Sequence, residues 1–353
     1  MQQTAANAQP TPHSGLGTQD LLVTGAPGWL CDVVLSRIAV QTPGVNIHCM
    51  IQKNLDEARV ASWLKEHPEV SQVSRGDLSP GAGLRIAWEF LRGGTVLHAA
   101  AIIHPRKTSD WYTINRDGTL RLATAAKENG VRRFVYVSSN AAQGAADSPT
   151  TLLTEAMPCK PLSHYGRSKF EAEQGLLKLH EAGKFDVVIV RPCMFYGPPV
   201  PQRHIDVFKR IQSGRLPLLG GGNYARSLSY VDDLADGIIL ALTHPNAPGE
   251  IFNLCDAQAY TTRQVCEAMA AALGVAPKFL PLPGFSASVA YGIDSALAAC
   301  GIYSMNFHLL GEANWNVGCS SAKAREKLGF APKVDVMEGY RRAVAWARER
   351  KLM

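Results

Sequence analysis

The chain has 353 residues, of which 46% are hydrophobic and 19% are charged, a globular balance without the signature of disorder. This length is ample for a large buried core and for one domain with a sizeable appendage. The net charge is +6, but the basic residues are scattered, and the densest basic cluster, residues 341–351, has the periodicity of an amphipathic helix. We therefore expect no nucleic-acid partner.

The chain carries no clear targeting or spanning segment. Residues 1–19 are polar and lack the basic and apolar regions of a signal peptide, so they are predicted as a flexible N-terminal tail. The eight cysteines include no CxxC pair, which favours free thiols in a reducing, cytoplasmic compartment and no metal site. Residues 285–303 are the most apolar later stretch, but they fall short of a transmembrane helix. Contact with a membrane surface stays open.

From residue 20 to residue 192, buried-type strands alternate with amphipathic helices. Strands are expected at 20–25, 45–52, 70–78, 95–102, 132–139 and 185–192, and helices at 29–41, 56–67, 111–130 and 164–183. This alternation predicts an α/β fold, a Rossmann-type doubly wound parallel sheet with helices on both faces. Ligands bind such sheets at the carboxyl ends of the strands.

After residue 192 the chain becomes loop-rich, which predicts a smaller C-terminal substrate lobe. We assign residues 20–192 and about 227–244 to the dinucleotide-binding domain, and residues 193–226 and about 245–353 to the substrate lobe. Residues 229–242 are expected to return to the main domain as a helix. Asp232 or Asp233 is placed to cap that helix, a commoner role for such residues than catalysis.

The turn after the first strand reads TGAPGWLC and predicts a nucleotide site. Gly25 allows a tight turn, and Gly28 lets the backbone approach a pyrophosphate at the N-terminus of the next helix. Cys31 replaces the third glycine of the usual fingerprint, where a small side chain still permits close packing. The residues of this turn expected to contact a dinucleotide are Gly25, Pro27, Gly28, Trp29 and Leu30.

Two further strand ends fit a dinucleotide. At the end of the third strand, Asp77 can accept a hydrogen bond from an adenine amino group while Leu78 packs on the ring. At the end of the fourth, small side chains let the backbone lie against the cofactor, at Ala99, Ala100 and Ala101. Each piece alone has an ordinary structural explanation, as a turn cap or as small core residues. Their shared position at strand ends favours the nucleotide.

The end of the second strand bears on which dinucleotide binds. An NAD site usually carries an acidic residue there, which holds the ribose 2′-hydroxyl. Here Gln52 and Lys53 occupy the end, and no acid follows until Asp56. Lys53 can attract a 2′-phosphate, so the sequence favours NADP(H), with NAD(H) as the alternative.

Several motifs together resemble the extended short-chain dehydrogenase/reductase superfamily, which includes NAD-dependent epimerase/dehydratase-like enzymes. They are TGAPG, GDL, HAAA, INRDGT, YVSSNAAQG, YGRSK, RPCMFYGP and YVDDLA, in that superfamily's order and spacing. RPCMFYGP, RSLSYVDDLA and the ending SSAKAREKLGFAPKVDVMEGYRRAVAWAR look most like the 3β-hydroxysteroid dehydrogenase-like and dihydroflavonol-reductase-like branch. The resemblance covers nearly all of the chain from Asp20 onward.

The resemblance implies a catalytic group. Tyr165 would be the general acid/base, moving a proton to or from a substrate oxygen during hydride transfer. A free phenol has a pKa near about 10, so Lys169, one turn on, would favour the phenolate and hold the nicotinamide ribose. Ser139 would hydrogen-bond the reacting oxygen. Asn115 would support the site, although it also has the simpler reading of a polar helix residue bonded to backbone.

Other positions follow from the same resemblance. Ser138 lies beside the catalytic serine, and Pro192, Cys193 and Met194 follow the sixth strand, where the family's backbone faces the nicotinamide. A nucleophilic Cys193 is disfavoured because no base is indicated beside it. The residues expected to contact substrate are Ser139, Asn140, His164, Tyr165 and Arg226.

The motifs leave the substrate open. Met194 replaces an asparagine usual in sugar-nucleotide enzymes, and residues 279–315 are rich in apolar side chains that would line an apolar pocket or form the lobe's own core. These features favour a reductase or dehydrogenase acting on a secondary alcohol or ketone of a hydrophobic small molecule. Arg226, which aligns with a diphosphate-contacting arginine, keeps a sugar-nucleotide epimerase or dehydratase as the alternative. A redox-silent nucleotide-sensing or scaffold protein is a third possibility. By analogy, helices at about 111–129 and 165–181 would form a homodimer.

Overall fold

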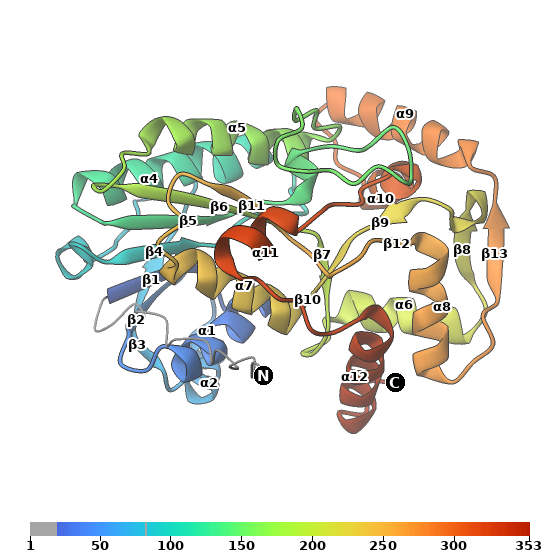
Figure 1. The fold of residues 1–353 in the computed structure, drawn as a ribbon, viewed down its shortest axis with the longest axis horizontal. Helices are drawn as coiled ribbons and strands as arrows, with labels where there is room; N and C mark the ends of the chain where they lie inside the picture. The colour runs from blue at the N-terminus through green and yellow to red at the C-terminus, as the bar shows by residue number, and fades with distance from the viewer. Residues whose placement is uncertain (1–19, 82) are drawn as a thin grey trace, which may run out of the picture.

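The computed structural model describes residues 20–81 and 83–353, and the predicted N-terminal tail lies outside them. Seven parallel strands form one sheet in the order β11-β6-β5-β4-β1-β2-β3 (Figure 1). Their bounds are β1 Asp20–Ala26, β2 Asn46–Gln52, β3 Val70–Gly76, β4 Thr95–His98, β5 Arg133–Val137, β6 Asp186–Pro192 and β11 Ile251–Leu254. The predicted α/β fold with a Rossmann-type sheet is confirmed.

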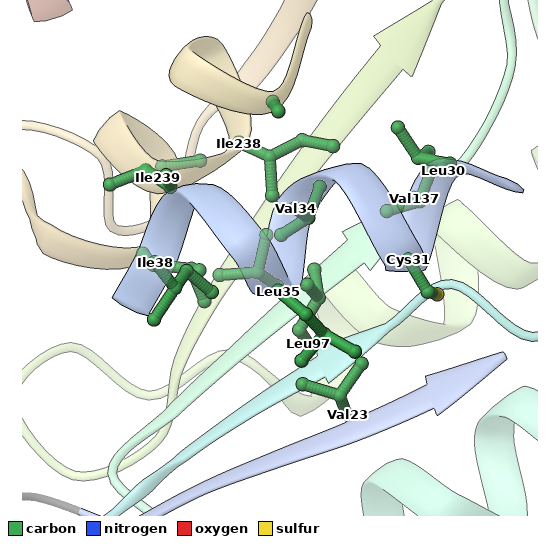
Figure 2. Close-up of a cluster of buried hydrophobic side chains, with 14 of the residues drawn as sticks. Val23, Leu30, Cys31, Val34, Leu35, Ile38, Leu97, Val137, Ile238 and Ile239 are labelled. Carbon is green, nitrogen blue, oxygen red and sulfur yellow. The ribbon is translucent and has the colours of Figure 1, made fainter. Parts of the chain in front are cut away.

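Helices cover both faces of the sheet, because successive strand residues point to opposite sides. Leu21 and Val23 of β1 pack into one core, whereas Leu22 packs into the other. On the first face lie α1 (Trp29–Gln41), α2 (Glu57–Glu66), α7 (Val231–Thr243) and α11 (Ala322–Leu328). On the second lie α4 (Thr119–Glu128) and α5 (His164–Leu179). Figure 2 shows α1 held between the strands and α7.

Short helices connect some of these elements. They are η1 Trp88–Leu91, α3 Thr108–Asp110 and η3 Asn140–Ala142. One segment, η2 Trp111–Gly118, is a π-helix that continues directly into α4. The sequence predicts a single α-helix over 111–130, so the wider winding at its start is a departure from that expectation. Single π-turns inside helices recur at functional sites.

A second core lies beyond the carboxyl ends of the strands and belongs to the lobe. It is built by α6 (Gln202–Gln212), α8 (Thr262–Leu273) and α12 (Val336–Glu349), packed on β7 (Met194–Tyr196) and β10 (Leu228–Tyr230). Short strand pairs join it, β9 (Ala225–Arg226) with β12 (Tyr260–Thr261) and β8 (Leu216–Leu219) with β13 (Phe279–Leu282). The lobe is completed by η4 (Gly220–Gly222), α9 (Phe285–Ala299), α10 (Met305–Gly311) and η5 (Glu312–Asn314).

Three details differ from the expectations drawn from the sequence. The strand β11 joins the main sheet beside β6, although residues from about 245 onward were assigned to the lobe; four residues are too few for a period to register. Helix α5 ends at Leu179, before the glycine stop at 183. Asp233 accepts hydrogen bonds from the backbone of Lys333 and Val334, both at 2.9 Å, and no side chain caps α7.

Across residues 20–81 and 83–353, no helix combines the length and the apolar character needed to cross a membrane.

Candidate active site

Helix α5 brings Tyr165 against the end of β5. Its N-cap is Ser163, whose hydroxyl accepts from the Gly166 backbone amide at 3.3 Å. A Cβ on Gly166 would lie 2.3 Å from the Ala141 carbonyl oxygen, so only glycine lets the helix approach this closely. Tyr165 is thereby hydrogen-bonded to Ser139, whose hydroxyl also accepts from the Ala141 amide at 3.2 Å. The structure therefore joins these two predicted catalytic residues.

Lys169 lies one turn along α5 and is almost fully buried, with 1% of its surface exposed. Its ammonium donates to the Val137 carbonyl oxygen at 2.9 Å and lies 4.7 Å from the centroid of the Tyr136 ring. Burial lowers the pKa of Lys169 to about 7, and the carboxylate of Glu173 acts against that shift.

The phenol of Tyr165 shifts in the opposite direction. Desolvation raises its pKa to about 12, the hydrogen bond with Ser139 lowers it, and the negative charge of Glu312 raises it further. At neutral pH the phenol keeps its proton. With this pKa the phenol of Tyr165 is in its protonated form, whereas the expectation from the sequence was a phenolate favoured by Lys169.

Asn115 is buried in the π-helix η2 and binds backbone. Its side-chain oxygen accepts from the Ile102 amide at 2.8 Å, and its amide nitrogen donates to the Ile102 carbonyl at 2.9 Å. The pair of bonds copies a strand ladder and holds the segment that follows β4. Asn115 therefore positions backbone, which agrees with its interpretation as a polar helix residue bonded to the main chain.

The turn after β1 has the shape of a dinucleotide cradle. Gly25 has φ +104°, and a Cβ there would lie 2.8 Å from the Ala100 nitrogen. A Cβ on Gly28 would lie 2.5 Å from the Gly25 carbonyl oxygen. Both glycines are required for this backbone path, and the N-terminus of α1 follows directly. The residues present therefore fit the pyrophosphate of a nicotinamide dinucleotide.

The strand ends around this turn contribute side chains to the same edge. Lys53 and Asp77 form an ion pair at 3.2 Å, and Gln52 is exposed. Leu78 is 6% exposed and already packs in the core beside Gly118. Three alanines follow β4 and are partly or fully exposed: Ala99, Ala100 and Ala101. Helix α1 begins with Trp29 and Leu30.

Ser138 is buried and bonds to a side chain of α5. Its hydroxyl donates to the Glu173 carboxylate at 2.5 Å, and Glu173 in turn binds Arg191 at 2.6 Å. Pro192 ends β6 and is buried, as is Cys193. The pKa of the Cys193 thiol is raised well above its usual range by its hydrogen bonding to the neighbouring Cys255 and Cys319 and by burial, which opposes a nucleophilic role. Met194 is 52% exposed.

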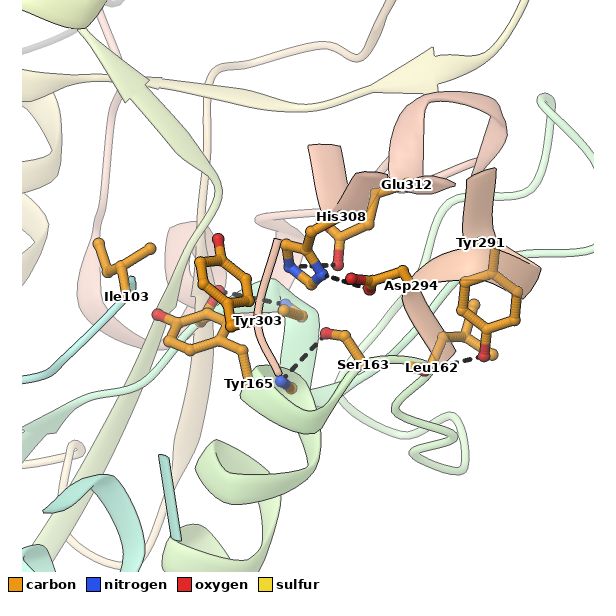
Figure 3. A network of polar contacts seen from close by, with 12 residues as sticks. Ile103, Leu162, Ser163, Tyr165, Tyr291, Asp294, Tyr303, His308 and Glu312 are labelled. Carbon is orange, nitrogen blue, oxygen red and sulfur yellow. Dashed lines mark hydrogen bonds and ion pairs between the residues drawn. The ribbon is translucent and has the colours of Figure 1, made fainter. Parts of the chain in front are cut away.

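A pocket of about 160 Å³ opens beside the start of α5, and a polar network lines it (Figure 3). The imidazole of His308 lies 3.0 Å from the Asp294 carboxylate and 3.3 Å from that of Glu312. Glu312 also receives a hydrogen bond from Ser163. None of these three ionisable residues was singled out from the sequence. Their i,i+4 spacing places His308 and Glu312 on one side of a helix, but the surrounding residues are mostly apolar and the segment was interpreted as a pocket wall or a core.

Aromatic rings pack beside this network. The ring of Trp111 lies parallel to that of His164, at 9° and 6.3 Å, and contacts Tyr303 edge-on. The imidazole Nδ1 of His164 is 2.8 Å from the Tyr112 hydroxyl. His164 therefore lines the pocket, as expected of a substrate-contacting residue. Asn140 instead lies next to Ser139, with their side-chain oxygens 3.4 Å apart.

Arg226 binds the chain's own backbone. Its guanidinium donates to the carbonyl oxygens of Glu312 at 3.1 Å and Ala313 at 2.7 Å, and to the Thr262 hydroxyl at 3.2 Å. These bonds fasten η5 to β9. Arg226, which was expected to contact substrate, is thus hydrogen-bonded to η5.

The cradle after β1 and the Ser–Tyr–Lys group on β5 and α5 define an enzyme of the extended short-chain dehydrogenase/reductase class. A family model described as the NAD dependent epimerase/dehydratase family matches residues 21–255. The chain belongs to this family, whose members are NAD-dependent enzymes, and the family-level expectation from the sequence is confirmed.

The relatives of this chain differ in what their names say. An uncharacterized protein y4nL of Sinorhizobium fredii is 35% identical over 92% of this chain and 94% of that relative. A UDP-glucose 4-epimerase of Vibrio cholerae is 30% identical over 53% of this chain and 60% of its own. A farnesyl-dihydroquinoline-oxide ketoreductase of Stigmatella aurantiaca is 26% identical, over 90% and 93% respectively. Among solved structures, gox2253 superposes with a TM-score of 0.75 at 25% identity, covering 95% of this chain and 99% of that one.

Proposed function

We propose that the protein is an NAD(P)-dependent oxidoreductase that interconverts a secondary alcohol and a ketone on a fairly hydrophobic small molecule. The observation that carries the proposal is the engagement of Arg226 by Glu312, Ala313 and Thr262. A guanidinium already bonded to backbone carbonyls is poorly placed to bind a diphosphate, which the sugar-nucleotide alternative requires. The name of the Stigmatella relative, a ketoreductase, supports the same chemistry.

The catalytic group is arranged for proton donation in the direction of reduction. A bound nicotinamide cofactor supplies the hydride. The substrate ketone oxygen would accept hydrogen bonds from the hydroxyls of Ser139 and Tyr165, and the proton of Tyr165 would pass to that oxygen as the carbon is reduced. Because the phenol is protonated at neutral pH, it starts in the form that this step needs. In the oxidative direction, Tyr165 would accept the proton instead.

The pocket walls support a substrate with an apolar body. Trp111, Tyr303 and Trp315 give aromatic surface, while Leu162 and Ile302 add aliphatic surface near the opening. Among these walls the carboxyl groups of Asp294 and Glu312 lie 3.0 Å and 3.3 Å from the His308 ring, so each has a polar partner. Rings and aliphatic carbons can pack on these side chains, and the polar groups in the same lining can meet one or two polar groups of a substrate.

Replacement of the phenol oxygen tests the proposal. Tyr165→Phe is expected to lower kcat by about 10²–10⁴-fold on any ketone or secondary alcohol that the unmodified enzyme converts, because proton transfer is lost. Affinity for the cofactor, measured by quenching of protein fluorescence, should change little. Tyr112→Phe is the matched control on a neighbouring phenol, whose hydroxyl lies 2.8 Å from the ring nitrogen of His164. Normal turnover by Tyr165→Phe would disprove the catalytic assignment.

The second candidate is an NAD(P)-dependent sugar-nucleotide epimerase or dehydratase. The family model and the name of the Vibrio relative favour it, and the Tyr–Lys–Ser group serves both chemistries. Mass spectrometry of the protein as purified separates the two, because an epimerase regenerates its cofactor in place and retains NAD⁺. A rise in melting temperature with UDP or dTDP would also favour this candidate. A redox-silent nucleotide sensor, the third possibility, would bind cofactor and turn over nothing.

The family is NAD-dependent, and we propose the phosphorylated form as the preferred cofactor. The support is local: Gln52 ends β2 and Lys53 follows it, both are exposed, and neither side chain is the acidic one that usually holds a ribose 2′-hydroxyl. The Lys53–Asp77 ion pair must rearrange for Lys53 to reach a 2′-phosphate. Tighter binding of NADPH than of NADH, measured by calorimetry, is the expected result.

Two further expectations stay proposals. The eight free cysteines, seven of them at least partly buried, support a cytoplasmic location. A homodimer would use the outer faces of α4 and α5, where a shallow groove runs past Leu120 and Thr124. Light scattering on the purified protein tests the homodimer, for which the expected mass is twice that of the chain.

A further inference from the structure

The lobe exposes an unusual amount of apolar surface on two adjacent helices. We call it the α9–α10 face, defined by side chains that are 39% to 69% exposed: Phe285, Val289, Ile293, Ile302, Met305 and Leu309. Of the fifteen residues of α9, only Ala287 and Ala290 are buried. In Figure 1 this helix lies along the outer edge of the lobe. Contiguous exposed apolar surface of this kind marks an interaction site.

Charge is missing from the same surface. Between residues 285 and 310 the sequence contains no lysine, arginine or glutamate. Asp294 and His308 are present, but they bind one another at 3.0 Å and face the pocket (Figure 3). A helix that faces water normally carries charged side chains on its outer side. The outer surface of α9 and α10 is therefore suited to an apolar environment.

Basic side chains border the face on the side of the main domain. Lys107 forms a backbone bridge with Ile302, and both it and the adjacent Arg106 are exposed. Arg167 is exposed as well and lines the pocket beside α9. An apolar patch with a basic border matches the interface of an anionic bilayer, where apolar side chains enter the acyl boundary and cations meet headgroups.

The pocket beside the start of α5 opens at this face. Leu162, Tyr291 and Ile302 line the pocket and are each more than a third exposed, so they belong to its rim. The hydroxyl of Tyr291 donates to the Leu162 carbonyl oxygen at 3.2 Å, which joins α9 to the segment before the catalytic helix. A molecule dissolved in a lipid layer under this face would reach the pocket without crossing water.

We propose that the α9–α10 face docks on the surface of an anionic lipid bilayer, with the apolar side chains at the acyl boundary and Arg106 and Lys107 among the headgroups. The helices lie on the bilayer and do not cross it. Entry of an apolar substrate from that surface would follow and rests on the proposed function. The docking itself does not, because it depends only on surface residues.

The test is binding of the full chain to lipid vesicles, measured by co-sedimentation. Vesicles of phosphatidylcholine alone are compared with vesicles that also contain phosphatidylglycerol. We expect binding to the anionic vesicles, and a reduction of about tenfold or more in the double variant Phe285→Ser/Val289→Ser, which removes apolar surface from α9. Lys107→Glu should weaken binding to anionic vesicles and leave the weak binding to neutral ones unchanged.

Val40→Ser is the matched control, since Val40 is 81% exposed on α1, far from this face in the sequence and on another element. Equal binding by the double variant and by the control would overturn the proposal, as would the absence of binding to anionic vesicles. If the double variant instead turns an oligomer into a monomer in light scattering, the face is a contact between two copies and the bilayer proposal is wrong. Turnover is not a readout, so failure here leaves the proposed chemistry untouched.

Discussion

Tyr165 and Lys169 lie one turn apart on the same helix, and burial shifts the pKa of each side chain in the direction that favours its uncharged form. Desolvation raises the pKa of the phenol to about 12 and lowers the pKa of the ammonium to about 7. A buried charge without a close counter-charge is unfavourable, so each group prefers the neutral state. At neutral pH the phenol therefore keeps its proton, and the amine loses its proton far more readily than an exposed lysine does.

Lys169 makes stability depend on pH. Its pKa is about 10.5 when unfolded and about 7 when folded, so between these values the unfolded chain binds more protons and the free energy of unfolding rises with pH. Between pH 7 and pH 9 the rise from this residue is about 2 kcal/mol. Lys169→Met should lose that increment in urea denaturation at the two pH values. If the free energy of unfolding of the variant depends on pH as steeply as that of the unmodified protein, the pKa of Lys169 is not lowered by burial.

At the scale of elements, a buried ion pair anchors the catalytic helix to the sheet. Glu173 of α5 is fully buried and binds Arg191 of β6 at 2.6 Å, and Arg191 is 1% exposed. Ser138, at the end of β5, donates to the same carboxylate. Because Glu173 lies one turn after Lys169, these contacts fix the helix along its axis. The positions of Tyr165 and Lys169 thus depend on a buried ion pair one turn further along the helix.

Removal of one charge from this pair should be strongly destabilising. Glu173→Gln is expected to lower the free energy of unfolding by about 3–5 kcal/mol, because it leaves the Arg191 guanidinium buried without a counter-charge. Glu171→Gln on the same helix removes a partly exposed partner of Arg116 and should cost less than about 1 kcal/mol. Urea denaturation measures both. Equal losses in the two variants would contradict the anchoring role.

For the molecule as a whole, a few polar contacts hold the outer part of the lobe in place, and one of them reaches the main domain. Arg226 of β9 holds the carbonyls of Glu312 and Ala313, and the ring nitrogen of His104 lies 2.8 Å from the Tyr303 hydroxyl. These bonds connect α10 and η5 to the rest of the chain, while α9 contributes little buried surface. We therefore expect α9, α10 and η5 to open before the sheet does.

The role of Arg226 in these contacts can be measured directly. Arg226→Met should increase hydrogen exchange in residues 305–316, because two carbonyls lose their donor, while the main sheet keeps its protection. Arg263→Met is the control: it removes an exposed guanidinium that donates to the Gly221 carbonyl at 2.8 Å. Unchanged exchange in 305–316 would mean that Arg226 does not fasten the segment, and the argument against a diphosphate-binding role would lose its support.

Local patterns predicted most of the fold and part of the site. Strand and helix periods, the glycine turn at Gly25 and Gly28, and the Tyr165–Lys169 spacing are features of neighbouring residues, so they can be read without tertiary structure. The sequence did not predict that the four-residue strand β11 belongs to the main sheet, because so short an apolar run shows no measurable hydrophobic period. Asp233 looked like a helix cap, yet its partners Lys333 and Val334 lie a hundred residues later.

The sequence by itself determined the fold class, the family and the candidate catalytic tyrosine, lysine and serine, because each depends on spacing within a few turns or strands. Tertiary structure alone brought Asp294, His308 and Glu312 together beside Tyr165 and turned Arg226 toward backbone carbonyls. It also left the apolar side chains of α9 exposed, although the same composition is compatible with a buried core. Burial, charge pairing and pKa depend on which distant segments meet, and no local pattern records that.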